Sequence, residues 1–100
     1  MNINNSTDLQ SQLKAAYSEL EGRKPQAAID RLMKIKVGWP NNSDAEHLIA
    51  LSYKSMGDLM LSKRHFIRCL EINQEQPEVH NNLANLLKSQ GALVDAEQHY

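Results

Sequence analysis

Apolar side chains recur every three or four residues along most of the chain, with polar side chains between them. This spacing places the apolar residues on one face of an α-helix. The predicted helices span residues 9–20, 25–37, 43–56, 59–73 and 78–90, and a sixth begins near Leu93. No segment alternates steadily between apolar and polar residues, so we expect no β-sheet.

Glycine and proline separate these segments. Gly22 and Pro25 lie between the first two helices, and Gly57 and Gly91 predict the turns after the third and the fifth. Glycine suits a helix C-terminus and proline suits the first turn of a helix. The expected N-terminal caps are Thr7 or Asp8 for the first helix and Ser43, in a capping box with Glu46, for the third.

The sequence around Gly57 repeats around Gly91, 34 residues later. The matched pairs are Ile49 and Leu83, Ala50 and Ala84, Tyr53 and Leu87, Leu59 and Leu93, Ser62 and Ala96, and Phe66 and Tyr100. A period of this size indicates stacked helical hairpins, none of which buries its apolar face alone. We therefore divide the chain into a polar leader, 1–8, and one domain, 9–100, with repeats at about 9–42, 43–76 and 77–100.

The first repeat fits this period less directly. Leu20 precedes Ala28 by 8 residues, whereas Tyr53 precedes Ser62 by 9. We interpret this difference as one residue deleted from the first turn. Small residues at Ala16, Ala50 and Ala84 are expected to let the two helices of each hairpin approach closely, and Ala28, Ser62 and Ala96 to do so between hairpins.

The repeated residues resemble the tetratricopeptide repeat family, whose pattern is W-x2-L-G-x2-Y…A-x3-F…P. The matching positions hold Glu46, Ile49, Ala50, Tyr53, Ser62 and Phe66 in the second repeat, and His80, Leu83, Ala84, Leu87, Ala96 and Tyr100 in the third. Glu46 replaces the aromatic residue of the pattern, and Gln74 replaces its final proline. The resemblance implies an all-α fold: a right-handed α-solenoid of three helix-turn-helix hairpins, the third truncated.

Composition argues against several classes of function. The net charge is −1, so no overall field attracts nucleic acid or an anionic membrane. A single cysteine, Cys69, allows no disulfide framework within the chain, and no apolar run has the ~20 residues of a membrane span. We expect a cytoplasmic domain whose partner is a protein or peptide, with no nucleic acid and no membrane.

No catalytic or metal-binding motif is recognisable. The four histidines, His47, His65, His80 and His99, lack the spacing of a zinc site, and His65 and His99 are repeat equivalents. The sequence contains no glycine-rich phosphate loop and no recognisable catalytic triad. We therefore expect no enzyme activity, no cofactor and no metal.

The resemblance implies that an extended peptide or a partner helix binds in a concave groove formed by the first helix of each hairpin. The groove residues it implies are Lys14, His47, Leu51, Lys54, Asn81, Asn82, Asn85 and Lys88. Glu78 falls where a clamp for a C-terminal carboxylate needs lysine, and it would repel that ligand, so we reject such a clamp. The third repeat is similar to repeats of the O-linked N-acetylglucosamine transferase type, in which an asparagine like Asn82 holds a peptide backbone.

The expected function is thus a scaffold for protein–protein interaction. The alternative is the N-terminal, substrate-recruiting module of a larger transferase, such as a glycosyl- or sulfotransferase. The third repeat stops before its second helix is complete, and repeat arrays need caps over their last apolar face. We expect this chain to be part of a longer array or protein, or to form a homodimer through its uncapped C-terminal repeat.

Overall fold

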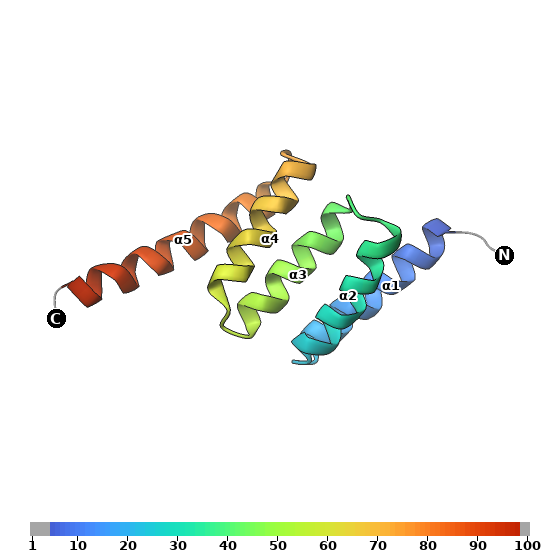
Figure 1. Ribbon diagram of the computed structural model, residues 1–100, viewed down its shortest axis with the longest axis horizontal. Coiled ribbons are helices and arrows are strands. Elements are labelled where there is room, and N and C mark those ends of the chain that lie inside the picture. Colours follow the sequence, from blue (N-terminus) through green and yellow to red (C-terminus); the bar gives the residue numbers. More distant parts are fainter. Residues whose placement is uncertain (1–4, 99–100) are drawn as a thin grey trace.

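The computed structural model describes residues 5–98, and the side chains of residues 8–91. The helices are α1 (Asn5–Glu21), α2 (Pro25–Gly38), α3 (Ser43–Ser55), α4 (Leu59–Ile72) and α5 (Pro77–Gln98). Within residues 5–98 there is no β-strand, which confirms the all-α class (Figure 1). The bounds of α2, α3 and α4 agree with the sequence prediction to within one residue.

The turn between α1 and α2 has the same backbone as the turn between α3 and α4. Arg23 and Gly57, 34 residues apart, both adopt the left-handed conformation, with φ of 62° and 83°. The next amide in each turn, of Lys24 or Asp58, donates to the carbonyl five residues earlier, at 2.8 and 2.9 Å. The first repeat therefore has its full length, and the predicted deletion is wrong. The left-handed residue of the first turn is Arg23 and not the neighbouring Gly22. Aligning the two turns by their glycines therefore shifts the first repeat by one residue.

Helix α3 lies at the centre of the packing. It contacts α1, α2 and α4, while α1 also packs on α2 and α5 on α4. One apolar cluster joins α1, α2 and α3, and a second joins α3, α4 and α5. The chain thus has two cores in succession rather than one central core. Its radius of gyration is 15.0 Å, against about 13 Å for a compact chain of this length.

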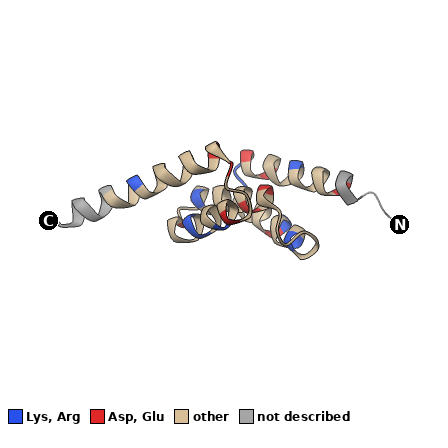
Figure 2. Ribbon diagram, turned by 90° about the horizontal axis from the view of Figure 1, so that it is seen from above, with Lys and Arg blue, Asp and Glu red and all other residues tan. Residues whose placement is uncertain are grey.

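The helices form two layers. Figure 2 shows α1 and α5 along one edge of the molecule. Helix α3 shares a hollow with them, so we assign it to the same layer, and α2 and α4 form the other. Small buried residues allow the close approach between them, as predicted: Ala16, Ala28 and Ala50 are buried, and the buried Ser62 hydroxyl donates to the Ala50 carbonyl at 2.8 Å. Adjacent helices therefore pack as helical hairpins. Ala84 differs because it is exposed.

The predicted turn at Gly91 and the separate sixth helix are wrong. Helix α5 continues through Gly91 to Gln98, so the chain has two hairpins followed by one long helix. At the equivalent turn, Asp58 follows Gly57 and its side chain accepts a hydrogen bond from the Leu61 amide at 3.1 Å, which starts α4. Ala92 follows Gly91 and cannot act as such a cap. The predicted repeat partners His99 and Tyr100 lie outside the described residues.

The same substitution at the two repeat-equivalent glycines should act in opposite directions. Gly57→Ala should destabilise the fold by about 1–2 kcal/mol, because alanine is strained at positive φ. Gly91→Ala should stabilise α5 by about 0.5–1 kcal/mol, because alanine favours a helix interior. A methyl group at either site would meet no atom within 4 Å, so sterics are matched. Urea denaturation tests the first variant, and far-ultraviolet circular dichroism with amide exchange across α5 tests the second. Lower helicity in Gly91→Ala would instead indicate a turn there.

Two predicted caps also need correction. Helix α1 already begins at Asn5, so Thr7 and Asp8 lie inside its first turn. The cap of α3 is Asn42, whose side chain accepts a hydrogen bond from the Ala45 amide at 2.8 Å. The Glu46 side chain is buried among α2, α3 and α4, so it forms no capping box.

Candidate functional site

A hollow of about 510 Å³ lies between α1 and α3 and reaches the start of α5. We call it the α1–α3 groove. Its lining comes from the three helices that the sequence assigns to the concave face: Gln10, Leu13, Lys14, Tyr17, Ser18, Asp44, His47, Leu48, Leu51 and Glu78. Apolar and polar side chains therefore share one open surface, as in many ligand sites.

The groove brings together some of the predicted binding residues. Lys14, His47 and Leu51 line it. Asn82 lies beside it on α5, with its Nδ2 atom 3.3 Å from Nε2 of His47. This contact suits the tautomer of His47 in which Nε2 accepts from the Asn82 amide. These four residues thus link all three helices of the layer.

The remaining four predicted residues do not line the groove. Lys54, Asn81, Asn85 and Lys88 are exposed on α3 and α5, away from this hollow. The predicted set omits Tyr17, which lies on the apolar stripe of the first helix and lines the groove. Its side chain is 49% exposed. A tyrosine at the edge of such a stripe is a usable signal, because its polar tip favours a half-buried position.

The surroundings of His47 favour its neutral form. Its ring is partly buried, and its centroid lies 6.1 Å from that of Phe66. Burial lowers the pKa of His47, and the opposing charges of Glu78 and Asp44 only partly offset this effect. The groove therefore offers an uncharged imidazole between two carboxylates.

Tyr17 forms part of the opposite wall. The charge of Glu21 and a hydrogen bond to it raise the pKa of the Tyr17 phenol, with a smaller effect from Glu78. The phenol thus remains protonated at neutral pH. Glu78, at the start of α5, lines the same hollow, and its charge acts to raise the pKa of both Tyr17 and His47.

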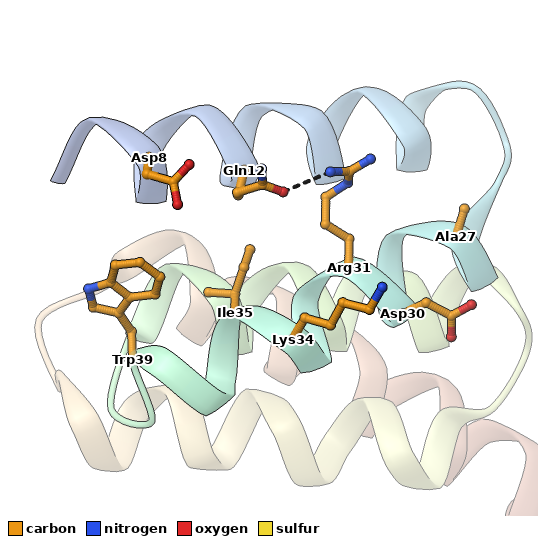
Figure 3. A pocket seen from close by; sticks show the side chains of 8 residues that line it. All are labelled: Asp8, Gln12, Ala27, Asp30, Arg31, Lys34, Ile35 and Trp39. Atoms are coloured by element: carbon orange, nitrogen blue, oxygen red, sulfur yellow. Dashed lines mark hydrogen bonds between the residues drawn. The ribbon is translucent and has the colours of Figure 1, made fainter. Parts of the chain in front are cut away.

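A second hollow, of about 550 Å³, lies between α1 and α2 (Figure 3). Arg31 crosses it: its Nη1 donates to Gln12 at 2.7 Å and its Nε donates to Glu19 at 2.8 Å. Trp39 packs on the first apolar cluster at one end of the hollow. Because Arg31 already has partners and Trp39 covers the core, we assign this hollow to the packing of the first hairpin.

The most buried polar cluster is centred on Glu46. Lys36 Nζ lies 2.7 Å from its Oε1 and His65 Nδ1 lies 2.7 Å from its Oε2, while the Tyr53 ring stacks on His65 at 5.6 Å. Burial alone would raise the pKa of Glu46, but the hydrogen bonds and charges of His65 and Lys36 outweigh it and lower the pKa. The cluster joins α2, α3 and α4, and it stands where the repeat pattern has an aromatic residue.

Cys69 is also buried. Its thiol donates to the Ser43 carbonyl at 3.1 Å, and the Gln76 amide lies 3.3 Å from the sulfur. Burial raises the pKa of the Cys69 thiol, so the thiolate needed for nucleophilic attack is scarce at neutral pH. In the part of the chain that the structure describes, no three His, Cys, Asp or Glu side chains gather as a metal site would require.

Comparison of the sequence with protein-family models gives no match, and comparison with curated proteins gives none either. None of the described helices is long and apolar enough to span a bilayer.

Proposed function

We propose that this chain is a protein-binding domain of the tetratricopeptide repeat type, in which stacked hairpins form a right-handed α-solenoid and the α1–α3 groove receives a segment of a partner protein. The observation that carries the proposal is the lining of the groove, which comes from α1, α3 and α5 and from no other helix. Three helices separated in sequence thus present one continuous surface to a ligand.

The chemistry of the lining suits a peptide. Leu13, Leu48 and Leu51 supply apolar surface, while Gln10 and Ser18 can form hydrogen bonds. Apolar contacts provide most of the affinity in such sites, and a few polar groups fix the orientation of the ligand. The groove is open, so it accepts part of a longer chain rather than enclosing a small molecule.

The charges limit which peptide fits. Asp44 and Glu78 lie at the groove beside the neutral His47, so a C-terminal carboxylate would be repelled there. Asn82 already approaches His47, so its amide would have to leave that partner to hold a peptide backbone. We therefore propose that an internal segment of the partner binds, through apolar side chains.

A pair of serine substitutions on one helix tests the groove. Ser18 lines it, whereas Ser11 is exposed on the same helix and does not. Peptides selected from a phage-displayed library against the intact chain serve as probes, and their affinity is measured by fluorescence polarisation. Ser18→Arg should weaken binding about tenfold or more by filling the groove, and Ser11→Arg should change it less than about twofold.

The proposal fails if no peptide is selected, or if both arginine variants bind the selected peptides as the unmodified chain does. Backbone amide shifts on peptide addition provide a second measurement. They should concentrate on α1, α3 and the start of α5. Shifts confined to α2 or α4 would place the binding surface elsewhere and contradict the proposal.

A cytoplasmic location is part of the same proposal. The free thiol of Cys69 is buried, and it has no second cysteine in the chain with which to form a disulfide. Proteins with such thiols are typical of reducing compartments.

A further inference from the structure

The net charge is −1, yet more than half of the lysine and arginine residues lie on two of the five described helices. Helices α2 and α4 contain six basic residues, Arg31, Lys34, Lys36, Lys63, Arg64 and Arg68, and two acidic ones. The other helices are mixed in charge: among their exposed, described side chains, α1, α3 and α5 carry the four carboxylates of Asp8, Glu21, Asp44 and Glu78 and the three lysines Lys14, Lys54 and Lys88. Helices α2 and α4 are therefore the more basic part of the molecule.

The basic layer exposes apolar side chains on α4. Met60 is 72% exposed and Ile67 is 40% exposed, seven residues apart and thus on the same side of the helix. Lys63, Arg64 and Arg68 lie around them, and together with Glu71 these residues line a shallow hollow of about 420 Å³. We call this surface the outer α4 face.

Its cations are available to a partner. Among the described residues, neither Lys63 nor Arg64 takes part in an ion pair. Arg68 is held at the edge of the face, because its Nη2 donates to Asn41 at 2.8 Å, and its Nη1 lies 3.9 Å from the exposed Glu71. A pre-positioned arginine loses less conformational entropy when it binds a carboxylate.

We propose that the outer α4 face docks an acidic segment of a partner protein, whose apolar side chains cover Met60 and Ile67 while its carboxylates pair with Lys63, Arg64 and Arg68. Charge complementarity is the argument for this occupant: the face combines two apolar side chains with a rim that is mainly positive. The cations of α4 would also steer an acidic partner toward this side of the molecule.

A protein segment fits this face better than an anionic membrane. Within the outer α4 face, Met60 and Ile67 are the apolar side chains that could insert into lipid, and Glu71 at the end of the face would be repelled by anionic headgroups. A short acidic helix can place a neutral or basic residue opposite Glu71. Methionine side chains also adapt to varied apolar partners. This inference is independent of the α1–α3 groove, which lies on the other side of α3.

The probe is a synthetic, fluorescently labelled helical peptide with leucines along one side and glutamates flanking them. Two comparison peptides serve as controls. One has the same composition in scrambled order, and the other has lysines in place of the glutamates. Vesicles of phosphatidylcholine with phosphatidylserine test the membrane alternative. Binding to the full chain is followed by fluorescence polarisation and by backbone amide shifts.

The acidic peptide should bind saturably and shift the amides of α4. The double variant Lys63→Glu and Arg64→Glu, and separately Ile67→Ser, should each weaken this binding about tenfold or more. Lys24→Glu with Lys34→Glu changes the net charge equally on exposed positions of the first hairpin, and it should weaken binding less than about threefold. All these side chains are at least partly exposed, so circular dichroism should show folded variants.

Four results would overturn the proposal. The first is that the acidic peptide does not bind saturably. The second is that the scrambled peptide or the lysine peptide binds as tightly as the acidic peptide. The third is amide shifts on α1 and α3 in place of α4. The fourth is binding to anionic vesicles without binding to the acidic peptide, which would assign the outer α4 face to a membrane.

Discussion

Phe66→Ala should lower the free energy of unfolding by about 3–5 kcal/mol. Phe66 is the largest fully buried side chain among the described residues. It fills the second apolar cluster, where α3, α4 and α5 meet. Removing the ring takes away its burial and leaves a cavity that three packed helices cannot readily close. Since domains of this size have about 5–15 kcal/mol of stability in total, the loss is a large fraction of it.

Ile67→Ala provides the matched control, because it truncates the neighbouring apolar side chain on the exposed side of α4. It should cost less than about 1 kcal/mol. Urea denaturation, followed by the fluorescence of Trp39 and by far-ultraviolet circular dichroism, measures both variants. Trp39 packs on the first apolar cluster, so coincident transitions by the two probes would show that both cores unfold together. Equal losses in the two variants would contradict the assignment of Phe66 to the core.

Glu46→Gln should destabilise the fold by about 2 kcal/mol at pH 7. The carboxylate is fully buried and lies 2.7 Å from both Lys36 and His65. A neutral amide removes the charge that both partners need, and its NH₂ group cannot accept a hydrogen bond. Because the three residues come from α2, α3 and α4, the loss should loosen the junction between the two hairpins.

The effect of Glu46→Gln should depend on pH. The pKa of Glu46 is lower in the folded chain than its usual value, because the charges and hydrogen bonds of His65 and Lys36 outweigh burial. A carboxylate with a depressed folded pKa stabilises the fold above its unfolded pKa, and this contribution is lost as the pH falls through the folded value. The stability difference between the unmodified chain and Glu46→Gln should therefore shrink below about pH 4.

Glu71→Gln is the control for this experiment. Glu71 is exposed and lies 3.9 Å from Arg68, so its neutralisation should change the stability by less than about 0.5 kcal/mol. Urea denaturation at a series of pH values measures both variants against the unmodified chain. A difference for Glu46→Gln that does not change between pH 7 and acid pH would show that the carboxylate charge is not what stabilises the cluster.

Local pattern was sufficient for most of the helices. The apolar spacing predicted α2, α3 and α4 to within a residue, because each has an apolar stripe and a glycine, proline or capping residue near its ends. The same reasoning failed at Gly91. A glycine permits a turn but does not require one, and without a capping residue after it the helix continues. Arg23 is the opposite case. It adopts the left-handed conformation of a turn, although the sequence pattern predicts a glycine at such a position.

The candidate site was predictable only in part. The family resemblance implied which helices would form the groove, and three of the eight predicted residues line the α1–α3 groove. Lys54 and Lys88 were assigned by repeat position, yet the groove ends before it reaches them. Whether a residue lines a hollow depends on the angle and separation of two helices, and these are set by side chains on both.

The sequence by itself determined the helical class, the 34-residue period and the positions of the small residues. The helical class depends on neighbours within a few turns of the same helix, and the other two are spacings along the chain. Tertiary structure alone decided the rest. It buried Glu46 between Lys36 and His65, placed the basic helices on one side of the molecule, and shaped the groove between α1 and α3. The physical reason is that burial, charge pairing and cavity shape arise between segments that are far apart in the chain. The local spacing of residues does not predict such contacts.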